Sequence, residues 1–313
     1  MIDDPERVIG AAGPWVHRDV SANGARFHVV EAGQGPAVIL LHGFPLFWWT
    51  WRRQLTALAD AGYRAIAMDL RGYGGSDHTP HGYDPVTLSA DIAGVVRSLG
   101  EEQACIVGHG WGGLGAWSVA VLQPTVVRGI VPISMPHPRA MRANLLRTGQ
   151  WRRLGFIAAF QVPIWPERTL TRDDGARVEQ FLRTWSADAA WVYEAAGPYR
   201  SAFLRWPTAH TAIEGHRWAV RSRWRTDGRR YMSAMGDPVA TDVLHVHGAH
   251  DPIVLGDSCA GSAAFVRGTY RAWTMPVGHF PHEEDPDGFT AGLLAWLADR
   301  PAHPKATGGT AGA

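Results

Sequence analysis

Position 110 holds a glycine where the surrounding residues are typical of a catalytic nucleophile. The segment Gly108-His109-Gly110-Trp111-Gly112 follows a short apolar run and opens an apolar helical pattern. A central residue flanked by small residues, between a strand and a helix, is the arrangement that exposes a nucleophilic Ser, Asp or Cys on a sharp turn. Glycine has no side chain, so position 110 cannot attack a substrate. The groups around it therefore decide which chemistry remains.

An acid and a histidine follow the turn at 110 in the order of a nucleophile, acid and base triad. Asp251 comes after the apolar run 243–246, and His279 comes after the run 270–275. We predict that Asp251 holds the His279 imidazole in one tautomer and stabilises its protonated form. We interpret the neighbouring histidines as structural or supporting groups: His42, His247, His250 and His282.

Two backbone N–H groups are predicted to form an oxyanion hole. Leu41-His42-Gly43-Phe44-Pro45 ends the apolar run 37–41, and the turn after such a strand supplies one donor, here Phe44. The residue after the nucleophile position supplies the other, here Trp111. The two turns lie some 65 residues apart in the chain, and their combination favours this interpretation over a simple Gly-Pro turn.

Three other kinds of site are not favoured. The glycine-rich loop Asp69–Ser76 lacks the Gly-Lys-Ser/Thr ending of a phosphate-binding loop and is interpreted as a structural turn. The chain has 15 histidines but no His-Glu-X-X-His or similarly spaced set, so no metal and no cofactor are expected. Ser134 ends a strand near the turn at 110, but a hydroxyl on that loop is poorly placed to replace the nucleophile.

Composition indicates a globular protein that acts on small molecules. Of the 313 residues 46% are hydrophobic and the net charge is +1, with no basic stripe for nucleic acid. The two cysteines, Cys105 and Cys259, indicate a reducing compartment. Met1–Arg7 lacks the pattern of a secretory signal, and no apolar stretch reaches the roughly 20 residues of a membrane span. We expect a cytoplasmic protein that binds a small apolar molecule and does not insert stably into a membrane. The oligomeric state stays open, and a homodimer is one alternative.

Alternating strand and helix patterns predict an α/β fold with a doubly wound, mostly parallel sheet. A helical pattern rich in Arg and Trp interrupts the alternation after the sixth strand. The predicted organisation has a first core part (1–136), a helical cap (137–238), a second core part (239–300) and a disordered tail (301–313). Ligand sites in such sheets lie at the carboxyl ends of the strands, so the cap would close a pocket there.

With these motifs in place, the chain resembles the α/β-hydrolase superfamily. It is most similar to the epoxide hydrolase branch, which is close to the haloalkane dehalogenases, and to the actinobacterial members of that branch. The resemblance covers the chain except its termini, and the cap segments 163–168 and 217–222 contribute to it. In that branch an Asp at the turn attacks an epoxide carbon to form an ester, and a His–Asp pair activates water to hydrolyse the ester. Two cap tyrosines hydrogen-bond the epoxide oxygen.

Carried over residue by residue, the resemblance is incomplete. His279, Asp251, Phe44 and Trp111 match the family, whereas the attacking Asp is replaced by Gly110. The cap tyrosines are replaced as well: one position falls near Phe156 and the other on His216, which together with Trp111 are predicted to contact the substrate. Three altered groups indicate natural divergence rather than a laboratory substitution.

Three functions stay open at this stage. The first is hydrolysis of a small apolar epoxide or ester by water that His279 and Asp251 activate in the space left at Gly110. The second is a ligand-binding protein of the same fold without catalysis, which the many cap tryptophans would suit. The third is a lyase or isomerase in which His279 removes a substrate proton.

Overall fold

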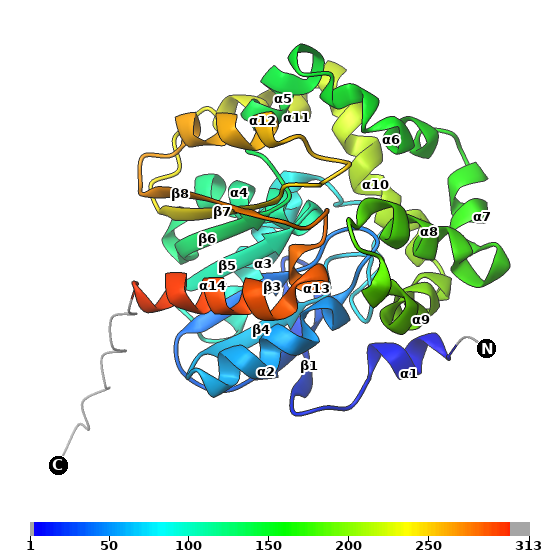
Figure 1. The fold of residues 1–313 in the computed structure, drawn as a ribbon, viewed down its shortest axis with the longest axis horizontal. Coiled ribbons are helices and arrows are strands. Elements are labelled where there is room, and N and C mark those ends of the chain that lie inside the picture. The colour runs from blue at the N-terminus through cyan, green and yellow to red at the C-terminus, as the bar shows by residue number, and fades with distance from the viewer. Residues whose placement is uncertain (1–2, 301–313) are drawn as a thin grey trace.

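A computed structural model describes residues 3–300, and an eight-stranded sheet forms its centre (Figure 1). The strand order is β1-β2-β4-β3-β5-β6-β7-β8; β1 and β2 pair antiparallel, as do β2 and β4, and every other pair is parallel. The strands are β1 (Val16–Ala22), β2 (Ala25–Ala32), β3 (Ala37–Leu41), β4 (Arg64–Met68), β5 (Ala104–His109), β6 (Val127–Ile133), β7 (Asp242–Gly248) and β8 (Tyr270–Met275). The predicted α/β fold with a mostly parallel sheet is confirmed.

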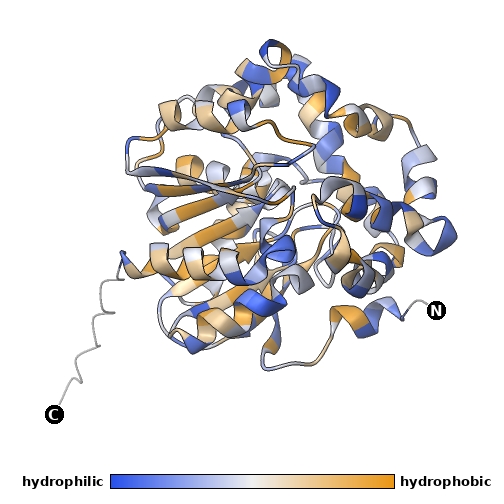
Figure 2. Cartoon of the chain, viewed as in Figure 1, coloured by the Kyte–Doolittle hydropathy of each residue, from blue (hydrophilic) through white to orange (hydrophobic). Residues whose placement is uncertain are grey.

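The central strands are continuous apolar runs because both faces of the sheet are covered. Every residue of β3 and of β5 is buried, and Figure 2 shows these strands as the hydrophobic centre of the molecule. The register pairs Leu41 with Gly108 and His109 with Ile133. The turns that follow β3, β5 and β6 therefore leave the sheet side by side at its carboxyl edge, where ligands bind in such folds.

Helices cover both faces of the sheet. α2 (Arg52–Asp60) and α14 (Pro286–Ala298) pack together on one face, and α3 (Pro85–Ser98) and α4 (Trp111–Leu122) pack together on the other (Figure 1). The shorter helices of the core are α1 (Pro5–Ile9), α12 (Gly256–Ala260) and α13 (Pro281–Glu284).

A helical segment joins β6 to β7, in the region expected to form the cap. Its helices are α5 (Pro138–Arg147), α6 (Gly155–Phe160), α7 (Trp165–Thr171), α8 (Ala176–Trp185), α9 (Ala190–Leu204), α10 (Thr208–Arg221) and α11 (Thr226–Ala234). In Figure 1, α6 to α10 gather beside the right-hand edge of the sheet. Residues 137–238 contain 17 arginines and 9 acidic residues, so this segment is strongly basic. Within residues 3–300 no helix has the length and apolarity needed to cross a bilayer.

The structure adds elements that the sequence patterns did not predict. β1 and α1 were not predicted, and a 3-10 turn, Trp48–Trp51, precedes α2. The predicted tail 301–313 lies outside the described residues.

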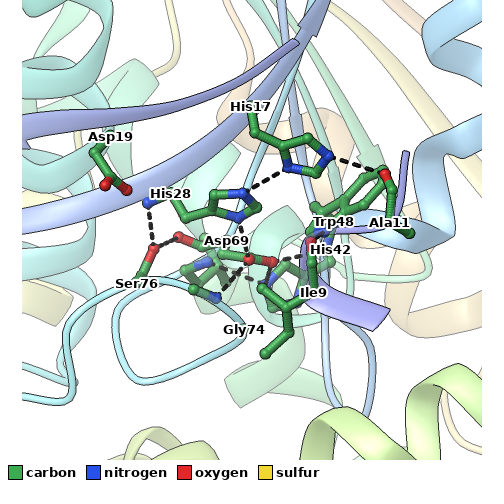
Figure 3. A network of polar contacts seen from close by, with 12 residues as sticks. Ile9, Ala11, His17, Asp19, His28, His42, Trp48, Asp69, Gly74 and Ser76 are labelled. Atoms are coloured by element: carbon green, nitrogen blue, oxygen red, sulfur yellow. Dashed lines mark hydrogen bonds and ion pairs between the residues drawn. The ribbon is translucent and has the colours of Figure 1, made fainter. Parts of the chain in front are cut away.

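A chain of hydrogen bonds, buried at its Asp69 end, ties the N-terminal strands to the loop after β4 (Figure 3). His17 Nε2 lies 2.9 Å from the carbonyl oxygen of Ala11, His17 Nδ1 lies 2.9 Å from His28 Nε2, and His28 Nδ1 lies 2.8 Å from Asp69 Oδ2. Asp69 also accepts from the N–H groups of Trp48 and Gly75. The carboxylate of Asp69 is fully buried, so its partners determine whether it can be ionised.

The partners of Asp69 favour its charged form. Burial by itself raises the pKa of Asp69, but the hydrogen bond and charge of His28, the charge of His42 and the Gly75 N–H together hold it below its ordinary value.

Candidate active site

Gly110 lies on a sharp turn with the backbone of a nucleophile elbow. Its φ is +52° and its ψ is −116°, a conformation that side chains of L-residues adopt only with strain. The Gly110 N–H donates to the Ile133 carbonyl, and the Gly110 carbonyl accepts from Leu114 in the first turn of α4. A Cβ at this position would have only Gly43 Cα near it, at 3.7 Å. The elbow is therefore formed, and there is room for a side chain on it.

Asp251 and His279 form the predicted pair. His279 Nδ1 lies 2.8 Å from Asp251 Oδ2, and both residues are buried. The other carboxylate oxygen, Oδ1, accepts from the N–H groups of Ile253 and Val254 at 2.7 and 2.9 Å. Because Asp251 accepts a hydrogen bond from the Nδ1–H group, the neutral imidazole of His279 has its lone pair on Nε2. The arrangement leaves one nitrogen of His279 able to accept a proton.

The backbone of His279 is held from two sides. His109, which precedes the elbow glycine, donates from Nε2 to the His279 carbonyl at 2.9 Å, and the His279 N–H donates to the carbonyl of Trp185 in α8 at 2.9 Å. Burial, and the nearby His282 and His279, hold the pKa of His109 well below its ordinary value, so His109 stays neutral. These contacts fix the distance between the elbow and the histidine loop.

The two predicted oxyanion donors lie on turns that touch. A Cβ on Gly43 would lie 3.2 Å from Gly110 Cα, so the turn after β3 meets the elbow directly. Neither the Phe44 N–H nor the Trp111 N–H donates to another group within residues 3–300. Trp111 is the first residue of α4, where helical N–H groups have no partner within the helix. Both N–H groups are thus free for a ligand.

Phe156 of α6 and His216 of α10 close the site from the helical segment. The His216 ring lies 5.4 Å from that of Phe44, 5.3 Å from that of Trp111 and 6.0 Å from that of Phe156. Burial lowers the pKa of His216 to about 4, so its ring is neutral at neutral pH. The two positions where family tyrosines were expected therefore share one wall with the oxyanion turns, and they present a phenyl ring and a neutral imidazole.

Nearby hydroxyl groups do not replace the missing ones. Tyr73 donates its hydroxyl to the Ala212 carbonyl at 2.9 Å, and Tyr199 donates to Glu283. Ser134 is fully buried, and its hydroxyl makes no hydrogen bond to His279 or to any other group in residues 3–300. Of the histidines interpreted as structural, His42 accepts from the Leu70 N–H and His282 bonds to Thr50.

Some contacts at the site were not predicted from the sequence. The Trp185 ring lies 5.4 Å from that of His279, and Phe160 and Phe181 pack edge-on against Phe44. Gly215 in α10 allows the Trp111 ring to pack on that helix, since a Cβ there would overlap the ring. The only hint in the sequence was the abundance of aromatic residues in this segment, and it did not say which of them meet.

Comparisons with known proteins agree with the fold. Residues 36–286 match a protein family described as alpha/beta hydrolase fold. Epoxide hydrolase A of Mycobacterium tuberculosis is 32% identical, over 91% of this chain and 98% of its own length. An AB hydrolase superfamily protein of Bacillus subtilis is 38% identical over 62% of this chain and 69% of its own. Among solved structures, an epoxide hydrolase from an endophytic Streptomyces superposes with a TM-score of 0.79 and 30% identity, covering 92% of this chain and 96% of that one.

Proposed function

Because the chain belongs to the α/β-hydrolase family, with epoxide hydrolases among its relatives, we propose that it hydrolyses a small apolar epoxide or ester without a covalent intermediate. The observation that carries the proposal is the intact His279–Asp251 pair beside an elbow that has space in place of a carboxylate. Hydrolysis in this fold otherwise begins with attack by the elbow side chain, and Gly110 has none.

In the proposed reaction, a water molecule occupies the space beside Gly110. His279 Nε2 removes a proton from this water as it attacks, and Asp251 stabilises the imidazolium that forms. The free N–H groups of Phe44 and Trp111 stabilise the negative charge on an ester carbonyl oxygen. With an epoxide, the neutral ring of His216 donates to the oxygen as the ring opens, in place of the tyrosines of the family.

An isotope experiment with a His279 variant tests the proposal. The protein is incubated with styrene oxide and with a p-nitrophenyl ester in ¹⁸O-labelled water, and labelled product is followed by mass spectrometry. His279→Ala is expected to lower the rate by about 100-fold, within the range of general-base contributions. The matched control is His250→Ala, since His250 also follows β7 but is exposed and its side chain makes no hydrogen bond within residues 3–300.

Equal rates from His279→Ala and the original protein would refute the mechanism. Saturable binding of the epoxide without any product would instead support the ligand-binding hypothesis, which the aromatic wall around Phe44 would also serve. The two outcomes are separated by measuring tryptophan fluorescence quenching and product formation on the same samples.

A further inference from the structure

A groove crosses the outer surface of the helical segment between α6 and α8. It encloses about 320 Å³ and has an apolar floor made by Phe156, Phe181, Trp185 and Ile253. Apart from Gly155, its remaining lining residues are polar, and three of them are arginines: Arg152, Arg153 and Arg177. All three arginine side chains are exposed. The groove therefore combines an aromatic floor with a cationic rim.

The floor of the groove is the outer side of the wall that encloses the candidate catalytic pair. Trp185 contacts the groove and also places its ring 5.4 Å from that of His279. Phe156 packs on Trp185 at 4.9 Å and reaches His216 on the inner side. Ile253 donates its N–H to Asp251. A ligand chain that passes between Phe156 and Trp185 would thus arrive at His279.

None of the three rim arginines has an acidic partner, unlike Arg200 and Arg217 in the same segment. Arg200 pairs with Glu179, and Arg217 pairs with Glu167 and Glu214. Within residues 3–300, Arg152, Arg153 and Arg177 have no carboxylate within 4.0 Å. Two of them are instead held over aromatic rings: Arg152 lies over Trp151 at 5.4 Å, and Arg177 over Phe181 at 4.8 Å.

We infer that this groove is the access site for a substrate with an apolar chain and one carboxylate group. Guanidinium groups bind carboxylates through paired hydrogen bonds, and the stacking on Trp151 and Phe181 reduces the side-chain freedom lost on binding. The apolar chain lies on the aromatic floor and leads its reactive end toward His279 when Phe156 and Trp185 move apart. The inference rests on the proposed hydrolytic function, which it extends by a substrate class.

Equilibrium binding of a non-reactive pair of probes tests the inference. Decanoate and decanamide share a chain length and differ in charge, and calorimetry below the micelle concentration compares their affinities. We expect decanoate to bind at least 10-fold more tightly at low salt, with the difference shrinking as salt rises, since exposed charges are screened. The triple variant Arg152→Gln/Arg153→Gln/Arg177→Gln should remove this preference and leave decanamide binding unchanged.

The matched control removes three arginines elsewhere in the segment. Arg221→Gln/Arg223→Gln/Arg230→Gln lowers the net charge equally, and these exposed side chains pair with no acid within the described chain. The control should keep the preference for decanoate. Equal affinity for both probes, or equal loss from both triple variants, would overturn the inference.

The outcome is distinct from that of the hydrolysis test. His279→Ala should bind decanoate as the original protein does, because its role is in the reaction. If that variant binds decanoate with the same preference while the original protein turns over no epoxide or ester, the inference about the groove is supported and the hydrolytic proposal fails. If hydrolysis depends on His279 but decanoate and decanamide bind alike, the hydrolytic proposal stands and the groove inference fails.

Discussion

Gly110→Asp is expected to raise the turnover of epoxides by about three orders of magnitude, because loss of the nucleophile of a triad costs several orders of magnitude in rate. The elbow already has the required backbone, the nearest atom to a new Cβ is 3.7 Å away, and His279 and Asp251 are paired. The aspartate would attack the epoxide carbon, and His279 would then activate water to hydrolyse the ester. Initial rates of diol formation measure the gain.

Two further variants make this result interpretable. Gly110→Asn has nearly the same shape and backbone strain but is a poor nucleophile, so its rate should stay at the level of the original protein. Gly110→Asp/His279→Ala should accumulate the ester, which intact-protein mass spectrometry detects as an adduct with the mass of the epoxide. A folded Gly110→Asp protein that is no faster than Gly110→Asn and forms no adduct would show that Phe156 and His216 have rebuilt the pocket for other chemistry.

Asp69→Asn is expected to lower the free energy of unfolding by about 3 to 5 kcal/mol, because it leaves buried donors without an acceptor at about 1 to 3 kcal/mol each. Asp69 accepts from His28, Trp48 and Gly75 and has no exposure to solvent. An amide has a single acceptor oxygen, so it cannot accept from all of these donors and places an NH2 group against one of them. Urea unfolding at neutral pH measures the loss. Asp60→Asn is the control, since Asp60 is exposed and its side chain makes no hydrogen bond within residues 3–300.

The same residue predicts a pH dependence. The pKa of Asp69 is lower in the folded chain than the value of about 3.9 in an unfolded chain. Its contribution to stability is therefore present above about pH 4 and is lost as the pH falls through the folded value. The original protein should lose stability in acid more steeply than Asp69→Asn. Parallel acid profiles of the two proteins would contradict this account.

The sequence predicted those parts of the fold whose pattern is local. β3 was predicted at its observed bounds because an apolar run of five buried residues lies between polar turns. β1 was missed because it is an edge strand: of its seven residues only Val20 and Ala22 are buried, so neither alternation nor an apolar run is visible. The five-residue helix α1 is too short to show helical periodicity.

The candidate site was predictable where chain order and motif sufficed. Asp251 and His279 follow consecutive strands, and the parallel sheet brings the ends of those strands together. The position of Trp185 depends on how α8 packs on the loop at His279, which no spacing in the sequence encodes. The pairing of His17 with His28 likewise depends on the register of β1 and β2, in which Asp19 lies opposite His28.

The hydrogen bonds of His109 and Trp185 to the backbone of His279 have a consequence for how such a site can change in evolution. Neither contact involves the side chain at position 110. A carboxylate there can be lost by mutation while the histidine keeps its place, so the remaining groups stay available to selection for another reaction. A single substitution at position 110 would then place a side chain on a turn whose backbone is already formed. In a site held in this way, single substitutions can change the reaction while the backbone of the remaining groups keeps its place.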